Sequence, residues 1–309
     1  ASIENIYESR IFVKSGDHIL VADTVYGPMR SRICGAILKR NAVEVEFYDP
    51  MIGAGIKDLV RDNTSLVYME SPGSLTFEVQ DVPAIVGALK GLDVITMIDN
   101  TWASGFFFKP LNHGVDIVVE ASTKYTVGHS DAMLGTATVA TEEHYRAIKV
   151  MANSFGYHAA PDDCYLGQRG LRTIGVRLRQ HEKNALKVAE WLSARDEVAR
   201  VMHPALPSDP GHELWKRDFE GSSGLFGVEL VPASKDAVMA MLDHYTLFGI
   251  GASWGGYESL VQTTYPGKLR TAHPWTSEGP TVRYHIGLED PDDLIDDLTE
   301  GFARYNAAR

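Results

Sequence analysis

The sequence of 309 residues contains only two cysteines, Cys34 and Cys164, which lie far apart and outside any Cys-x-x-Cys spacing. This low cysteine content favours free thiols in a reducing, cytoplasmic location. No apolar run approaches the ~20 residues that a membrane-spanning helix needs. The N-terminal residues also lack the basic and then apolar layout of a signal peptide.

Positive charge is scarce as well. Lysine and arginine together number 29 against 41 aspartates and glutamates, which gives a formal net charge of −12 at pH 7. This balance disfavours nucleic acid or an anionic membrane surface as the main partner. With 44% hydrophobic and 23% charged residues, the composition is that of an ordinary soluble globular protein. The length predicts about two domains.

Several site motifs are missing. His129 and Asp131 have no His-x-x-x-His or clustered ligand spacing around them, so we expect no metal site. The acids at 289–297 lack the glycine and spacing of a calcium loop and indicate a capped helix. No Gly-x-Gly-x-x-Gly follows the first predicted strand, which weakens a nicotinamide dinucleotide site. A further group of basic residues predicts ion pairs on helix faces: Arg169, Arg172, Arg177 and Arg179.

Short apolar runs alternate with helical segments through the first part of the chain. The predicted strands are 19–21, 43–47, 65–69, 94–98 and 116–119, and the predicted helices are 28–40, 56–60 and 81–89. This alternation predicts an α/β fold with a mostly parallel sheet flanked by helices. Helices at 142–153 and 177–194 follow, and the second ends a predicted large domain, 1–194. A smaller α+β domain, 195–309, is predicted from strands at 198–202, 225–230 and 282–286 and helices at 235–242 and from 290.

Polar side chains follow two of the predicted strands. Asp99 comes directly after the run 94–98, and Lys124 follows the run 116–119. Ligands of open α/β sheets bind beyond the carboxyl ends of strands. A lysine amine can form a Schiff base with pyridoxal phosphate while a carboxylate partners the pyridinium nitrogen. The two residues together therefore indicate this chemistry, although either alone is more often a surface charge or a turn cap.

Four further residues join this hypothesis. The hydroxyl groups of Ser122 and Thr123 would donate to a phosphate. Tyr26, at the end of an earlier predicted strand, would either stack on the cofactor ring or pack beneath a loop. Arg283 lies in a predicted strand and needs a partner, which is either a substrate carboxylate or an internal ion pair.

From about Ser15 to Tyr305, the chain resembles the fold-type I pyridoxal-phosphate enzymes of cysteine and methionine metabolism. The resemblance rests on these stretches in register: SGDHIL, DTVYGP, ESPGSLTFEVQDVPAI, IDNTWASG, ASTKYTVGHSDAMLGT, GLRTIGVRLRQHEKNALKVAEWL, HPALP, HELWKRDFEGSSGLF, SWGGYESL and HIGLEDPDDLIDDL. Among them, ESPGS, DNTW and SWGGYES resemble the β-lyase branch of the family more than its γ-lyase or γ-synthase branches.

The resemblance implies a large domain of the pyridoxal-phosphate transferase type and pyridoxal 5'-phosphate as cofactor. It implies β-elimination on L-cystathionine, which yields homocysteine, pyruvate and ammonia in methionine biosynthesis. A homotetramer built from dimers is implied as well. In the STKY motif, Lys124 would bind the cofactor and shuttle protons, and Asp99 in IDNTW would pair with the pyridinium nitrogen.

Other matched positions would complete the site. Tyr26 would stack on the ring and assist near the substrate amine, and Ser122 and Thr123 would contact the phosphate. The α-carboxylate of the substrate would be held by three residues: Arg283, Ser253 and Trp254.

Part of the family pattern has no match. The family's upstream glycine-containing loop and helix N-terminus, which cradle the phosphate, are not found, and Tyr7-Glu8-Ser9-Arg10 has the wrong spacing for its Tyr-x-Arg pair. Ala252 stands where a tyrosine is usual, which would change the pocket shape. Two alternatives stay open. One is a broader cysteine-S-conjugate β-lyase or cysteine desulfhydrase, and the other is a cofactor-binding or regulatory protein with little activity.

Overall fold

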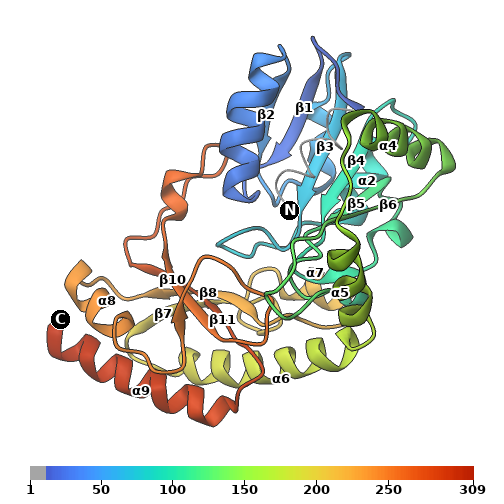
Figure 1. The fold of residues 1–309 in the computed structure, drawn as a ribbon. Coiled ribbons are helices and arrows are strands. Elements are labelled where there is room, and N and C mark those ends of the chain that lie inside the picture. The colour runs from blue at the N-terminus through green and yellow to red at the C-terminus, as the bar shows by residue number, and fades with distance from the viewer. Residues whose placement is uncertain (1–11) are drawn as a thin grey trace.

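The computed structural model describes residues 12–309 (Figure 1). Its first sheet has six strands in the order β2-β1-β3-β4-β5-β6. The strands are β1 His18–Ala22, β2 Glu44–Tyr48, β3 Thr64–Glu70, β4 Ile95–Asp99, β5 Ile117–Glu120 and β6 Thr136–Val139. Strands β1 to β5 run parallel, and β6 is antiparallel to β5. The predicted α/β fold with a mostly parallel sheet is confirmed.

The central strands are apolar and covered on both faces, which explains their nearly continuous hydrophobic sequences. Ile19, Leu66 and Ile98 are completely buried in the core of this sheet. The connections are helical: η1 Met29–Leu38, η2 Gly53–Leu59, α2 Val82–Leu89, α3 Ser104–Phe107 and η3 Pro110–His113. Asp81 caps α2 as predicted, because its Oδ1 accepts a hydrogen bond from the Ala84 N–H over 3.1 Å.

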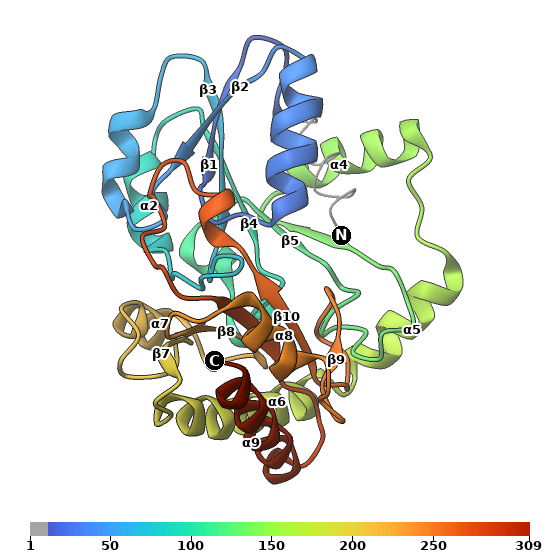
Figure 2. The ribbon, with the colours of Figure 1, turned by 90° about the vertical axis from the view of Figure 1, so that its left-hand side faces the viewer.

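Three helices connect the first sheet to the second: α4 Glu142–Phe155, α5 Pro161–Leu171 and α6 Ile174–Ser193. The long α6 belongs to two cores. Leu178 packs with the first sheet, whereas Val188 and Leu192 pack with the second. Figure 2 shows α6 running along the base of the molecule beneath the second sheet. The division into domains 1–194 and 195–309 stays a prediction.

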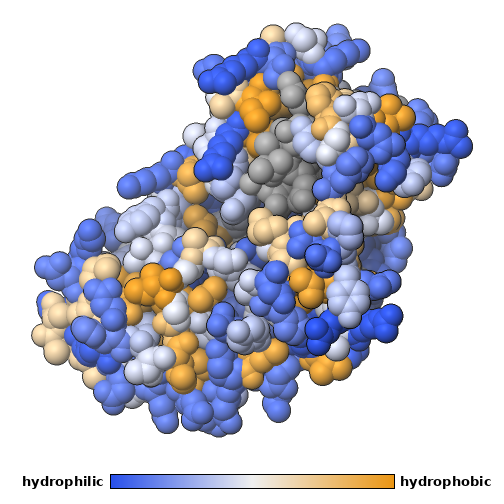
Figure 3. All heavy atoms as spheres, in the orientation of Figure 1, coloured by the Kyte–Doolittle hydropathy of each residue, from blue (hydrophilic) through white to orange (hydrophobic). Residues whose placement is uncertain are grey.

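The second sheet has five strands in the order β7-β8-β11-β10-β9. They are β7 Val198–Met202, β8 Leu225–Leu230, β9 Gly249–Ile250, β10 Leu260–Thr264 and β11 Thr281–His285, antiparallel except for the pair β10–β9. The remaining helices are α7 His212–Asp218, α8 Lys235–Leu242, η4 Pro266–Lys268 and α9 Pro291–Ala308. Leu298 and Phe302 of α9 are buried in this second core. The outer surface along α6 and α9 is mainly hydrophilic (Figure 3).

Some elements have no counterpart in the sequence prediction, including α5, α7, β6 and β10. In α5 the buried positions are Gly167 and Gly170, so this helix has no apolar stripe to signal it. Within residues 12–309, no helix combines the length and apolar character needed to cross a membrane. Tyr7 and Arg10, whose spacing departs from the family's Tyr-x-Arg pair, lie outside the described residues.

Candidate active site

The carboxyl edge of the six-stranded sheet meets a loop of the second sheet at Lys124. This lysine lies four residues beyond β5, and its Nζ donates a hydrogen bond to Ser253 Oγ over 2.8 Å. Ser253 belongs to the loop between β9 and β10. The ring of Trp254 from the same loop is centred 5.1 Å from Lys124 Nζ. The structure therefore brings together three residues that the sequence analysis assigned to one site.

The amine of Lys124 is less basic than an ordinary lysine. Burial lowers its pKa to about 8, the positive charge of Arg283 contributes to the decrease, and the negative charge of Asp99 opposes it. A larger fraction of the amine is therefore neutral near physiological pH. Neutral lysine amines are the form that attacks an aldehyde or accepts a proton.

A buried arginine holds the loop that carries Lys124. Arg177 donates from Nη1 to Tyr125 O over 2.6 Å, and from Nη2 to Gly170 O over 2.7 Å and to Thr126 O over 3.3 Å. Its side chain therefore pairs with main-chain carbonyls rather than with carboxylates. The predicted helix-face ion pair is wrong for Arg177, because this side chain turns into the protein, where carbonyl groups of the lysine loop need donors.

Gly255 and His285 fix the opposite side of the lysine. Gly255 has a φ of +86°, and a Cβ atom at this position would lie 2.8 Å from Lys124 Cβ, so only glycine allows the approach. The N–H of Gly255 donates to His285 Nε2 over 3.0 Å, and His285 Nδ1 lies 3.0 Å from Glu258 O. Burial lowers the pKa of His285 well below its usual range. The neutral ring therefore accepts at Nε2 and donates from Nδ1.

Asp99 ends β4 at the same edge. Its Oδ1 accepts hydrogen bonds from the main-chain N–H and the hydroxyl of Thr101, over 2.9 and 2.5 Å. These two contacts orient the carboxylate. Its negative charge acts on Lys124 and keeps part of the basicity that burial removes. Asp99 is thus placed where the sequence analysis expected it, within electrostatic reach of the lysine.

Two further acids flank Asp99, and the sequence analysis did not select either of them. Glu70 ends β3 and is the register partner of Asp99, and Glu120 ends β5. Burial, and then repulsion by Asp99, raises the pKa of both carboxyls, that of Glu120 to about 7. The available signal was that each is the last residue of a buried strand, as Asp99 is.

Tyr26 and Arg283 approach the site from the two sheets. The main-chain N–H of Tyr26 donates to Glu70 Oε2 over 2.7 Å, and its side chain is 43% exposed. Arg283 donates from Nη2 to Ala252 O over 2.8 Å and to Ser253 O over 3.2 Å. Burial lowers the pKa of Arg283 to about 10, against the opposing influence of the Tyr26 and Tyr125 hydroxyls. Within residues 12–309, Arg283 forms no ion pair with a carboxylate.

Ser122 and Thr123 already have partners inside the protein. Ser122 Oγ lies 2.9 Å from Thr136 Oγ1. The hydroxyl of Thr123 donates to Leu134 O over 3.1 Å and accepts from Leu134 N–H over 2.8 Å. Both therefore hold the lysine segment against the chain that enters β6. The predicted phosphate contact would require each hydroxyl to exchange or share these partners, and it stays a prediction.

The sequence matches the family model described as "Cys/Met metabolism PLP-dependent enzyme" over residues 5–303. The chain belongs to this family. It is 49% identical to the cystathionine β-lyase MetC of Escherichia coli over 299 residues, which cover 95% of this chain and 75% of that protein. It is 48% identical to the cystathionine β-lyase of Salmonella typhimurium, with the same coverage. A crystal structure of cystathionine γ-synthase from Xanthomonas oryzae pv. oryzae superposes with a TM-score of 0.93 at 30% identity, covering 100% of this chain and 81% of that one.

Enzymes of this family use pyridoxal 5'-phosphate, and the donor set described above fits that cofactor. Lys124 supplies an amine of lowered pKa, Asp99 supplies an oriented carboxylate, and Tyr26 supplies an exposed aromatic ring. Arg283 offers a guanidinium group without an ion-pair partner in the described part of the chain. Sequence reasoning missed Arg177 and His285 as supports of the site, because their partners are distant in the chain and only the fold identifies them.

Proposed function

We propose that the protein cleaves the carbon–sulfur bond of L-cystathionine by β-elimination and releases homocysteine, pyruvate and ammonia. The observation that carries the proposal is that Ser253 brings Lys124 and Arg283 together, because its hydroxyl accepts from Lys124 Nζ over 2.8 Å and its carbonyl accepts from Arg283 Nη2 over 3.2 Å. A base and a carboxylate anchor are both needed to remove the α-proton of an amino acid. Two relatives at 48 and 49% identity bear the name cystathionine β-lyase, which supports this choice of substrate.

Arg283 binds the substrate, and Lys124 transfers its protons. The planar guanidinium of Arg283 binds the α-carboxylate through two parallel hydrogen bonds. The amine of Lys124 takes the α-proton of the substrate, which it accepts only when neutral. It later returns protons to the departing groups. The hydroxyl of Ser253 lies 2.8 Å from this amine and steadies its position between steps. The thiolate of homocysteine leaves the β-carbon, and water then converts the remaining fragment to pyruvate and ammonia.

Pyridoxal phosphate, when bound, supplies a ring that draws electrons from the substrate α-carbon. Asp99 would hold a proton on the pyridine nitrogen of that ring, and Tyr26 would stack against its face. Ser122 and Thr123 would donate to the phosphate in exchange for their present partners. Trp254, whose ring is centred 5.1 Å from Lys124 Nζ, would contact the substrate at the carboxylate end of the site.

The oligomeric state and the cellular location of the protein are part of the same proposal. The protein acts as a homotetramer, and α4 offers surface for such contacts, because none of its residues is buried and Tyr145, Val150 and Phe155 are more than half exposed. It acts in the cytoplasm, where a reducing environment suits Cys34 and Cys164, both of which are free thiols.

Product analysis tests this function. The purified protein is incubated with pyridoxal phosphate and L-cystathionine, and the 2-oxo acid and the thiol products are identified by mass spectrometry. The proposal predicts pyruvate and homocysteine in equal amounts. Release of 2-oxobutyrate and cysteine would instead assign γ-cleavage. Turnover of cysteine faster than of cystathionine would favour the desulfhydrase alternative.

A further inference from the structure

Residues 265–280, between β10 and β11, leave the second sheet and contact the first. We call this segment the clasp. Figures 1 and 2 both show it rising from β10 to lie alongside η1. Near its end, the hydroxyl of Ser277 hydrogen-bonds to Glu229 of β8, so the clasp is anchored to its own sheet before β11 begins.

The carboxylate of Asp23 is the main attachment point of the clasp on the first sheet. Asp23 directly follows β1 and is 1% exposed. Its Oδ2 accepts hydrogen bonds from three consecutive main-chain N–H groups, those of Thr271, Ala272 and His273, over 2.8, 2.9 and 3.1 Å. Its Oδ1 accepts from Arg30 Nη1 over 2.8 Å and from Thr271 Oγ1 over 3.0 Å. Consecutive N–H groups directed at one oxygen form a binding site for an anion.

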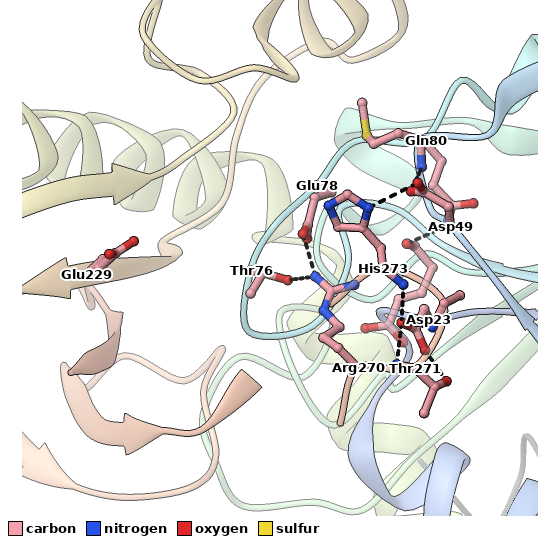
Figure 4. Close-up of polar contacts among 12 residues, drawn as sticks. Asp23, Asp49, Thr76, Glu78, Gln80, Glu229, Arg270, Thr271 and His273 are labelled. Atoms are coloured by element: carbon pink, nitrogen blue, oxygen red, sulfur yellow. Dashed lines mark hydrogen bonds and ion pairs between the residues drawn. The ribbon is translucent and has the colours of Figure 1, made fainter. Parts of the chain in front are cut away.

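Other polar contacts of the clasp surround this attachment (Figure 4). Arg270, whose side chain is 4% exposed, donates to Thr76 Oγ1 and to the carboxylate of Glu78. The ring of His273 lies 3.2 Å from a carboxylate oxygen of Asp49. Burial favours a higher pKa for Asp23, but its hydrogen bonds from His273, Thr271, Arg30 and Ala272 outweigh this effect and lower it. Asp23 therefore remains ionised and holds the clasp at neutral pH.

The clasp joins the two sides of the active site. On one side, Asp23 begins the turn that presents Tyr26, and the carbonyl of Thr24 in this turn accepts from Ser74 N–H over 2.8 Å. On the other side, the clasp leads directly into β11, where Arg283 is the third residue. A movement of the clasp would consequently change the distance between Tyr26 and Arg283.

We propose that Asp23 is a positioning residue, which fixes Tyr26 and Arg283 across the site by holding Thr271, Ala272 and His273 of the clasp. The inference rests on the proposed function for the assignment of the substrate carboxylate to Arg283. When Asp23 loses its charge, the clasp loosens and amino acids bind less tightly. Covalent attachment of the cofactor is retained, because the amine of Lys124 makes it and lies outside the clasp, whereas the stacking of Tyr26 on the ring weakens.

The test is a titration of the holoenzyme with L-alanine, which has the amine and carboxylate of the substrate but no leaving group. Binding is followed through the absorbance of the bound cofactor. Asp23→Asn should raise the Kd for L-alanine about tenfold, while the absorbance band of the attached cofactor is still present before the titration. Asp23→Glu, which keeps the charge, should recover part of the affinity. Trypsin should also cut Asp23→Asn faster after Lys268 or Arg270, because the clasp is less firmly held.

Asp81→Asn is the matched control. Asp81, which caps α2 beside the first sheet, also makes a contact between the two sheets' surroundings, because its carboxylate accepts from Arg217 of α7 over 2.7 Å. Unlike Asp23, it does not contact the clasp. This variant should bind L-alanine as the wild type does. Wild-type affinity in Asp23→Asn, or an equal loss in Asp81→Asn, overturns the proposal.

If Asp23→Asn does not fold, Thr271→Val takes its place. This change removes only the hydroxyl contacts to Asp23 and Arg30, the second of which spans 2.6 Å. A Kd raised at least twofold supports the proposal, and an unchanged Kd overturns it. If the protein releases no pyruvate from cystathionine, the proposed function is refuted. The titration with L-alanine still tests the role of Asp23, because L-alanine binds without being cleaved.

Discussion

The amine of Lys124 lies 2.8 Å from the hydroxyl of Ser253, so a residue from the edge of the first sheet meets one from a loop of the second. Burial is the main reason that the pKa of Lys124 is lowered to about 8, and the positive charge of Arg283, also from the second sheet, adds to the decrease. The reactivity of the lysine is therefore a property of both sheets together. Any change that separates them should make Lys124 an ordinary, more basic lysine.

The rate of cofactor attachment should report this lowered pKa. Only the neutral amine attacks the aldehyde of pyridoxal phosphate. The rate of attachment to the cofactor-free protein should rise with pH and level off above about 8, the pKa of Lys124. It is measured as the growth of absorbance after mixing at a series of pH values. A rate that still climbs towards about 10.4, where a solvated lysine titrates, would contradict the environment described for Lys124.

Arg283→Lys should weaken substrate binding. A lysine keeps the positive charge but loses the planar pair of donors that grips a carboxylate. We expect KM for L-cystathionine to rise at least tenfold, with a smaller decrease in kcat, in steady-state assays of pyruvate release. Arg217→Lys, an exposed site on α7, is the control and should leave KM unchanged. An unaltered KM in Arg283→Lys would remove Arg283 from the carboxylate site.

Gly255→Ala should disturb the loop that packs on Lys124. The new methyl group would lie 2.8 Å from Lys124 Cβ, and the φ of +86° strains any residue other than glycine. We expect a loss of about 1–3 kcal/mol in the free energy of unfolding and a strong decrease in kcat. Gly87→Ala is the control, because a Cβ at this position in α2 meets nothing within 4 Å. It should be neutral or slightly stabilising, since alanine favours helix.

Glu120→Gln should change how stability depends on pH. Burial and Asp99 raise the pKa of Glu120 to about 7 from 4.5, so the folded protein binds the proton more tightly than the unfolded chain does. The contribution of the Glu120 carboxyl to the free energy of unfolding is fully present below pH 4.5 and is lost as pH rises through about 7. At pH about 8, Glu120→Gln of the cofactor-free protein should be more stable than the wild type by about 1–3 kcal/mol.

The comparison is made by thermal or urea unfolding of both proteins at pH about 5 and about 8. The gain of Glu120→Gln should be much smaller at the lower pH, where Glu120 is largely protonated. Glu190→Gln, on the exposed face of α6, should match the wild type at both pH values. A gain that is the same at both pH values would show that the effect of Glu120→Gln is unrelated to ionisation.

The parallel sheet and the positions of Asp99 and Lys124 were predictable because each follows a short apolar run. Such runs mark buried strands, and polar residues at their ends lie at one edge of a parallel sheet. The same logic would have selected Glu70 and Glu120, which also end strands at this edge. A carboxylate after a strand is commonly a turn residue, and only Asp99 was set against that alternative by its combination with Lys124.

Other supports of the site could not be read from local sequence. Asp23 meets residues 271–273, and Arg177 meets the carbonyl of Tyr125, so their partners are set by tertiary packing rather than by spacing along the chain. Arg177 was predicted to form an ion pair on a helix face because the chain as a whole is acidic. The pattern of a helix gives its buried face but not the acceptors that this face will meet.

Pyruvate release from L-cystathionine by the wild type and by Lys124→Ala tests the active-site role of Lys124 most directly. We expect continuous release by the wild type with pyridoxal phosphate, and no turnover by Lys124→Ala, because the variant lacks both the attachment point and the base. Lys216→Ala, which removes an exposed lysine of α7, should retain wild-type rates. Near-normal pyruvate release by Lys124→Ala would contradict the assignment of the active site.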